Sequence, residues 1–196
     1  MRLYFPIWKL TQRCLIGVGI AALVYGGGVA TYGEVYQWYE SWRFDQAIAQ
    51  PGDTKSGFLN ETPDLHEGDV VGRLEISRLG ISLMVLQGIE EQTLSAGAGH
   101  VPGTSMPGLE GNVVIAAHRD TFFRRLKGIL PGDRVEMITL RGTYHYIVDS
   151  VEIVNPEDTK VMESRAAKEL TLITCYPFRF VGAAPGRFIV HARSGA

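Results

Sequence analysis

At positions 171–178 the chain reads Thr-Leu-Ile-Thr-Cys-Tyr-Pro-Phe, a β-branched, apolar run that predicts a strand followed by a turn. The strand would hold the Cys175 thiol rigidly, and the turn would open the space in front of the sulfur. The only other cysteine, Cys14, lies in an apolar N-terminal run and is not expected to meet Cys175. A solitary cysteine at a strand end is a candidate nucleophile, although an inert buried cysteine is the commoner case.

The N-terminal segment has the composition of a membrane anchor. Arg2, Lys9 and Arg13 precede Cys14–Gly33, which contains no charged residue. About 20 apolar residues cross a bilayer core as a helix, and the basic flank predicts a cytoplasmic N-terminus. The alternative is a signal peptide cleaved near Gly28-Val29-Ala30. We favour a retained anchor, because the apolar run is longer than the core of a usual signal peptide.

Export of the domain strengthens the case for a reactive Cys175. Extracytoplasmic proteins usually pair their cysteines or lack them, so an unpaired exported thiol indicates a thiol that is used. The net charge of −2, without a basic stripe, argues against a nucleic-acid partner. No Cys/His pair has metal-ligand spacing and no Asp-rich calcium loop is present, so neither a metal nor another cofactor is expected.

Three segments are expected along the chain. Residues 1–33 form a cytoplasmic tip and transmembrane anchor, residues 34–68 a juxtamembrane helix and linker, and residues 69–196 the folded domain. The juxtamembrane helix covers Glu34–Gln50, and Pro51–Gly68 has the turn-rich composition of a linker. One face of the helix carries the residues Val35, Trp38, Tyr39 and Trp42. Tryptophan and tyrosine are typical of a membrane interface, so we expect this helix at the membrane surface.

Short apolar runs separated by turn signals fill the folded domain. Arg134–Leu140 and Thr143–Val148 flank Arg141-Gly142, which is a hairpin pattern. Six further strands are predicted: Val70–Ile76, Ile81–Leu86, Asn112–Ala117, Val151–Val154, Leu170–Thr174 and Arg187–Ala192. Three short helices are predicted: Glu90–Ala96, Thr121–Ile129 and Lys160–Lys168. Many short strands with little helix predict a mainly-β fold, a closed or nearly closed β-barrel.

A thiol nucleophile needs a base or a cation beside it. His118 ends the apolar strand at 112–117, where a side chain is held firmly yet exposed on one side, as a general acid/base requires. A turn histidine bonded by Asp120 is the alternative. Arg187 enters the last strand and could donate to an oxyanion or a substrate carbonyl, with a surface salt bridge as the alternative. Local or structural roles are expected for the other histidines, and one of them, His100, lies in a predicted loop. The others are His66, His145 and His191.

Three motifs in this order resemble a sortase: Val114–Asp120, Thr171–Phe178 and Ala184–Val190. The family's pattern is a strand-end histidine, a Thr-Leu-x-Thr-Cys strand and an arginine on the next strand. The run His118–Phe123 and the Cys-Tyr-Pro-Phe continuation resemble the class D branch in particular. Ala117 departs from the pattern, since related sequences often have glycine before the histidine.

The resemblance implies a closed eight-stranded sortase-type β-barrel with short helices behind an N-terminal transmembrane helix. It implies a single-pass protein of the plasma membrane whose catalytic domain is extracytoplasmic. The activity would be that of a cysteine transpeptidase, which cleaves a Leu-Pro-x-Thr-Gly-like sorting motif near the C-terminus of secreted proteins. The product would pass to an amine acceptor of cell-wall or pilin type.

The same resemblance implies a role for each site residue. Cys175 would form a thioester with the substrate threonine, and His118 would protonate the leaving amine and then activate the incoming one. Arg187 would stabilise the oxyanion or position the substrate, and Thr174 would help to line the site. Two alternatives stay open: a cysteine peptidase that uses water as acceptor, and a non-catalytic barrel that binds peptides.

Overall fold

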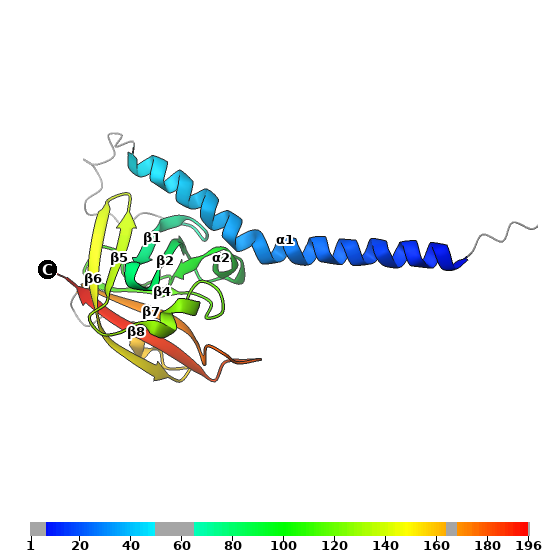
Figure 1. Ribbon diagram of the computed structural model, residues 1–196. Coiled ribbons are helices and arrows are strands. Elements are labelled where there is room, and N and C mark those ends of the chain that lie inside the picture. The colour runs from blue at the N-terminus through cyan, green and yellow to red at the C-terminus, as the bar shows by residue number, and fades with distance from the viewer. Residues whose placement is uncertain (1–6, 50–64, 164–167, 196) are drawn as a thin grey trace, which may run out of the picture.

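The protein is described by a computed structural model over residues 7–49, 65–163 and 168–195, in which eight strands close into a barrel (Figure 1). Neighbouring strands follow the order β1-β2-β3-β4-β7-β8-β6-β5 and return to β1. The strands are β1 Val70–Ile76, β2 Ile81–Gln87, β3 Ala98–His100, β4 Gly111–Ala116, β5 Arg134–Thr139, β6 Gly142–Val154, β7 Lys168–Tyr176 and β8 Gly186–Ser194. The helices are α1 Ile7–Ala49, α2 Glu91–Ala96, η2 Ser77–Leu79, η3 Arg124–Gly128 and η4 Thr159–Met162.

The predicted closed barrel is confirmed, with two differences in its strands. The expected strands at 143–148 and 151–154 are parts of one long strand, β6, whose register against β8 shifts between Val148 and Ser150. The sequence also gave no sign of β3, which pairs parallel with β2 and antiparallel with β4. With only three residues, β3 is too short to show a strand's alternation of apolar and polar side chains.

His100 lies on β3, so the prediction that it occupies a loop was wrong. Its side chain is buried, and its Nδ1 lies 2.8 Å from Gln87 Oε1 while its Nε2 lies 3.0 Å from the Ser105 carbonyl oxygen. Burial lowers the pKa of His100, because the charged imidazolium loses its hydration. His100 therefore holds β2, β3 and the following loop together as a structural side chain.

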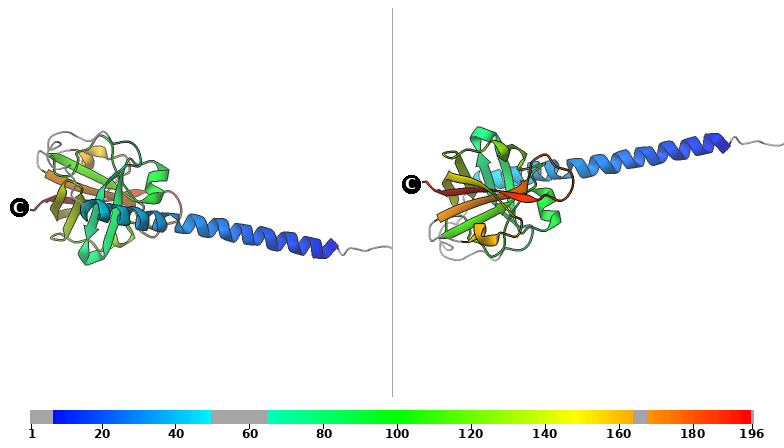
Figure 2. Two further views of the ribbon diagram at one scale, coloured as in Figure 1. Left: turned by 90° about the horizontal axis from the view of Figure 1, so that it is seen from above. Right: turned by 90° about the horizontal axis from the view of Figure 1, so that it is seen from below.

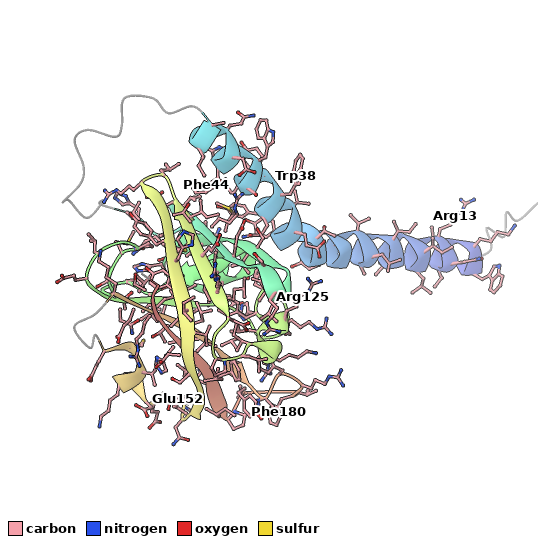
Figure 3. All side chains as sticks on the ribbon, turned by 60° about the vertical axis from the view of Figure 1, so that its left-hand side comes forward. Arg13, Trp38, Phe44, Arg125, Glu152 and Phe180 are labelled. Carbon is pink, nitrogen blue, oxygen red and sulfur yellow. The ribbon has the colours of Figure 1, made fainter. Side chains whose placement is uncertain are left out.

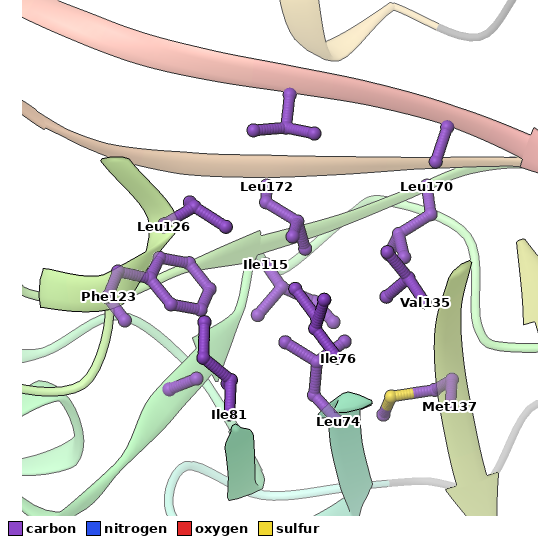
Figure 4. Close-up of a cluster of buried hydrophobic side chains, with 14 of the residues drawn as sticks. Leu74, Ile76, Ile81, Ile115, Phe123, Leu126, Val135, Met137, Leu170 and Leu172 are labelled. Atoms are coloured by element: carbon purple, nitrogen blue, oxygen red, sulfur yellow. The ribbon is translucent and has the colours of Figure 1, made fainter. Parts of the chain in front are cut away.

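The core fills the inside of the barrel. Leu74 and Ile76 of β1, Ile115 of β4 and Leu172 of β7 meet there, and Phe123 closes the barrel beside η3 (Figure 4). All five side chains are fully buried. Each buried aliphatic or aromatic side chain of this size contributes about 1.5–3 kcal/mol through removal of apolar surface from water. The strands that carry the site are thus held from the inside.

Helix α1 is one continuous helix, where the sequence predicted an anchor and a separate juxtamembrane helix. Its 43 residues contain no proline, so no residue forces a break near Gly33. Of the helices in the described ranges, α1 is the one long and apolar enough to cross a membrane, by length and composition. The predicted linker falls almost entirely on residues 50–64, which lie outside the described part of the chain.

The C-terminal half of α1 packs on the barrel through a face that carries polar groups. Gln37 Oε1 accepts from the Met84 amide at 2.6 Å, and Gln37 Nε2 donates to the Ala96 carbonyl at 2.8 Å. Phe44 is buried against the barrel, whereas Trp38 on the opposite side of the helix is 71% exposed (Figure 3). The predicted stripe of Val35, Trp38, Tyr39 and Trp42 therefore faces away from the barrel.

Candidate active site

Strand register brings the three predicted catalytic residues to one level of the sheet. Cys175 of β7 lies directly opposite Arg187 of β8 in the antiparallel ladder. On the other side of β7, Ala116 of β4 pairs with Ile173 in parallel, and the Ala117 amide donates to the Ile173 carbonyl at 3.2 Å. When the same offset is continued for two residues beyond this pair, His118 is level with Cys175. The register thus places a thiol and a guanidinium on neighbouring strands, with the imidazole two residues beyond the end of β4.

Alternation along the strands assigns these residues to the outer face of the barrel. Leu172 and Thr174 belong to the row of β7 residues that points inward, so Cys175 belongs to the opposite row. Cys175 and Arg187 are half-buried, and the His118 side chain is 36% exposed. The site is therefore reachable from solvent while its strands stay anchored in the core.

Arg187 has donor groups to spare. Its Nη1 donates to the Gly186 carbonyl at 3.1 Å, and no carboxylate of the described residues forms an ion pair with it. A guanidinium carries five N–H groups, so Arg187 keeps further donors at the strand position opposite Cys175. An arginine in this position can donate to the negative oxygen that forms on a carbonyl group when the thiol attacks it.

Thr174 connects the two strands that carry His118 and Cys175. Its hydroxyl is buried and donates to the Ala117 carbonyl at 2.7 Å. That bond fixes the end of β4 against β7, directly before the histidine on one strand and the cysteine on the other. The expectation that Thr174 also lines the substrate site stays a prediction.

Arg119 is a functional candidate that the sequence reasoning did not single out. Its Nη1 donates to the Pro177 carbonyl at 2.9 Å, and its Nη2 donates to the Phe180 carbonyl at 3.0 Å and to the Gly182 carbonyl at 3.5 Å. The guanidinium also lies 5.9 Å from the centre of the Phe180 ring. Arg119 thus links the segment directly after His118 to the β7–β8 loop, which follows Cys175. No local pattern predicts such a contact between residues so far apart in sequence.

Aromatic rings support the base of the β7–β8 loop. Phe178 lies 5.1 Å, centroid to centroid, from Phe188 in an edge-to-face arrangement, and 6.3 Å from Tyr176. Such pairs are worth about 0.5–1.5 kcal/mol beyond the burial of their area. The chain is therefore held on both sides of the turn after Cys175.

A cleft of about 1060 Å³ opens beside His118. One wall comes from α1 and includes Val24, Tyr25 and Tyr32, and the other comes from α2 and the segment after His118. The nearest carboxylate to the imidazole is Glu91 of α2, with 3.9 Å between Glu91 Oε1 and His118 Nε2. Glu91 rather than Asp120 is thus the acid beside this histidine.

The other histidines lie away from this level of the sheet. His145 pairs with Glu136 at 3.5 Å on the barrel surface, and His191 Nε2 lies 2.9 Å from Glu152 Oε1. His66 lies 3.7 Å from Asp69 near the start of the barrel. Within residues 7–49, 65–163 and 168–195, no group of three or more His, Cys, Asp or Glu side chains is placed to hold a metal ion.

A family profile described as the sortase domain matches residues 74–194, which contain the whole site. The chain belongs to the sortase family. It is 34% identical over 140 residues to Sortase D of Bacillus subtilis, an alignment that covers 71% of this chain and 68% of that protein. It is 30% identical over 115 residues to Sortase A of Bacillus anthracis, covering 57% of this chain and 54% of the relative.

Solved structures give the same fold. A Sortase D5 transpeptidase of Clostridium perfringens superposes with a TM-score of 0.70 at 24% identity, covering 85% of this chain and 99% of that one. The predicted sortase barrel and the likeness to class D are therefore confirmed. Sortases are cysteine transpeptidases, so this sortase is an enzyme of that class.

Proposed function

We propose that this sortase cleaves a Leu-Pro-x-Thr-Gly-like motif in secreted proteins and transfers the cleaved protein to an amine at the cell surface. The observation that supports this most is the register that sets Cys175 opposite Arg187 and level with His118. A nucleophile, a proton carrier and an oxyanion donor are the three groups that acyl transfer requires.

In the first half-reaction, the Cys175 thiol gives its proton to His118, and the sulfur attacks the carbonyl carbon of the substrate threonine. The carbonyl oxygen becomes an oxyanion, which Arg187 stabilises by hydrogen bonding. The C–N bond to the following glycine then breaks, and His118 gives a proton to the leaving amine. The product of this step is a thioester between the threonine acyl group and Cys175.

In the second half-reaction, an incoming amine attacks the thioester carbonyl. His118 takes a proton from that amine and gives it to the sulfur as the C–S bond breaks, which restores the thiol group of Cys175. The new bond is an amide, so the transferred protein ends up joined to the acceptor. The buried hydroxyl of Thr174 supports this chemistry because its bond to the Ala117 carbonyl fixes the relative position of the two strands.

We also propose that α1 remains in the protein as a single transmembrane anchor with the catalytic domain outside the cytoplasm. The 20 uncharged residues Cys14–Gly33 and the basic residues before them support this orientation. The division into an anchor at 1–33, a connecting segment at 34–68 and a catalytic domain at 69–196 belongs to the same proposal. The partners are then secreted proteins that carry a sorting motif, and acceptor amines of cell-wall or pilin type.

Mass spectrometry tests the reaction directly. The purified protein is mixed with a panel of sorting peptides, with and without an amine acceptor, and analysed for an acyl adduct on Cys175 and for the joined product. We expect both from the wild type and neither from Cys175→Ala. Absence of adduct and product over a broad panel would contradict the proposed reaction.

The ratio of products separates transpeptidation from peptide hydrolysis. A peptidase would release the same free acid whether or not an amine is present, whereas a transpeptidase shifts its product to the amide as the amine concentration rises. A non-catalytic peptide-binding barrel would bind the peptides without acylation of Cys175. We expect the amide product to dominate at high amine concentration.

A further inference from the structure

We infer that the end of the barrel that carries His118 lies in the headgroup layer of the bilayer crossed by α1, and that exposed apolar side chains contact lipid there. The inference rests on the proposed function in one respect, the retention of α1 as a membrane anchor. It adds a second contact between enzyme and membrane. We call the surface that makes this contact the membrane-facing edge. It consists of Trp38, Phe122, Arg124, Phe180 and Val181.

The length of α1 sets the depth of the barrel. The 20 uncharged residues Cys14–Gly33 form about 30 Å of helix, which is the thickness of a bilayer's hydrocarbon core. The barrel touches α1 at the last of these residues. A Cβ atom added to Gly33 would lie 2.8 Å from the Ser95 carbonyl oxygen and 3.2 Å from Phe122 Cζ. No stalk therefore separates the uncharged run from the barrel, and Phe122 lies where the hydrocarbon core ends.

The cleft beside His118 reaches the same uncharged part of α1. Its α1 wall includes Val24, Tyr25 and Gly28, which belong to the uncharged run and precede Gly33 by five to nine positions. Its other wall includes His118. The cleft therefore extends from His118, at the headgroup layer, toward the part of α1 that the bilayer surrounds.

Charge in the cleft identifies which layer of the bilayer it meets. The lining carries both signs: Glu34, Glu91, Asp120 and Arg124. Charged side chains are costly in hydrocarbon and well solvated among zwitterionic headgroups. The headgroup layer is therefore the part of the membrane that this surface fits.

Exposed apolar residues lie on the β7–β8 loop and on α1. On the β7–β8 loop, Val181 is 99% and Phe180 is 47% exposed. All three views show this loop on the side of the barrel toward which the N-terminal half of α1 leaves (Figures 1 and 2). On α1, Trp38 is 71% exposed and follows Gly33 by five residues, or about 7.5 Å of helix. Aromatic side chains concentrate at this depth of membrane proteins.

Depth-dependent fluorescence quenching tests the inference without any turnover. The full chain carries Cys14→Ser and Cys175→Ala, so that one introduced cysteine takes an environment-sensitive NBD label. Labels are placed at Val181→Cys, at Leu140→Cys and at Ile20→Cys in separate variants. Leu140 is the matched control, because it is 63% exposed and lies on the β5–β6 turn, away from the membrane-facing edge. Ile20 reports on the anchor itself.

The proteins are reconstituted into phosphatidylcholine–phosphatidylglycerol vesicles with a quencher on the lipid headgroup or deep in the acyl chain. We expect blue-shifted emission and headgroup quenching at position 181, water-like emission without quenching at 140, and acyl-chain quenching at 20. Equal quenching at 181 and 140, or a blue shift at 181 without lipid quenching, overturns the inference, the latter because it indicates a protein partner. Absence of quenching at 20 overturns the anchor and the inference together, while the acyl-enzyme test on Cys175 still stands.

Discussion

Arg119→Ala is the perturbation that best tests how the two halves of the active site are held together. Arg119 follows His118, the proposed proton carrier, and donates to the carbonyls of Pro177 and Phe180 at 2.9 and 3.0 Å, with a longer contact of 3.5 Å to Gly182. Alanine removes all of these bonds and the contact with the Phe180 ring. We expect the β7–β8 loop to leave its position over the turn after Cys175 for part of the time.

The size of the effect follows from the two short bonds. A hydrogen bond from a charged donor contributes about 1.5–3 kcal/mol when shielded, and less when solvent reaches it. Arg119 is half-buried and the Phe180 side is exposed, so we take about 1 kcal/mol for each bond. A total of about 2 kcal/mol corresponds to a factor of about 30 in the ratio of positioned to displaced loop. Arg119→Lys keeps the charge and one bond, so it should lose about fivefold.

The assay is kcat/KM for a sorting peptide, with the rate of Cys175 alkylation by iodoacetamide measured in parallel. Arg179→Ala is the matched control, because Arg179 is an exposed arginine on the same loop. We expect Arg119→Ala to lower kcat/KM by up to about 30-fold and Arg179→Ala to leave it within about twofold. Thermal unfolding of Arg119→Ala should fall by several degrees, in line with about 2 kcal/mol of lost bonds, and that of Arg179→Ala should be nearly unchanged. Equal activity of the two variants would refute the idea that Arg119 positions the loop.

Three further predictions concern contacts around the barrel. Gln37→Ala leaves the Met84 amide and the Ala96 carbonyl without their side-chain partner, so calorimetry should find a loss of about 1–3 kcal/mol, and an unchanged unfolding temperature would contradict this. Thr174→Val keeps the shape but removes the bond to the Ala117 carbonyl; kcat should fall while peptide affinity holds, and a change in affinity alone would point to substrate contact instead. The Arg78 guanidinium beside Asp133 lowers the pKa of that carboxyl below its usual value near 3.8, so this ion pair stabilises the fold above that pH and is lost as the pH falls below it. The free energy of unfolding, measured with urea between pH 3 and pH 6, should therefore depend less on pH for Asp133→Asn than for the wild type. The same pH dependence in both proteins would contradict a stabilising Arg78–Asp133 ion pair.

The sequence predicted those parts of the fold that repeat a local pattern. The apolar runs before His118 and Cys175 were long enough to indicate buried strands, and their ends located both residues. The packing face of α1 was missed for the opposite reason. Gln37 is polar, yet it faces the barrel because it satisfies a strand amide and a helix carbonyl. The sequence analysis assigned only the aromatic stripe that includes Trp38, which it placed at the membrane surface and which is exposed.

The positions of the proposed catalytic groups depend on residues buried in the core of the barrel. The β4–β7 ladder keeps one offset from Gly111↔Lys168 to Ala116↔Ile173, without a bulge, and the inward row packs Ile115 beside Leu172. A slip of one residue would turn that apolar row outward and Cys175 inward, because side chains alternate between faces. The cost of exposing the core residues therefore fixes the register, and the register fixes which residue stands opposite Arg187. The inward-facing row of core side chains therefore determines which residues the outer face of the barrel presents at the site.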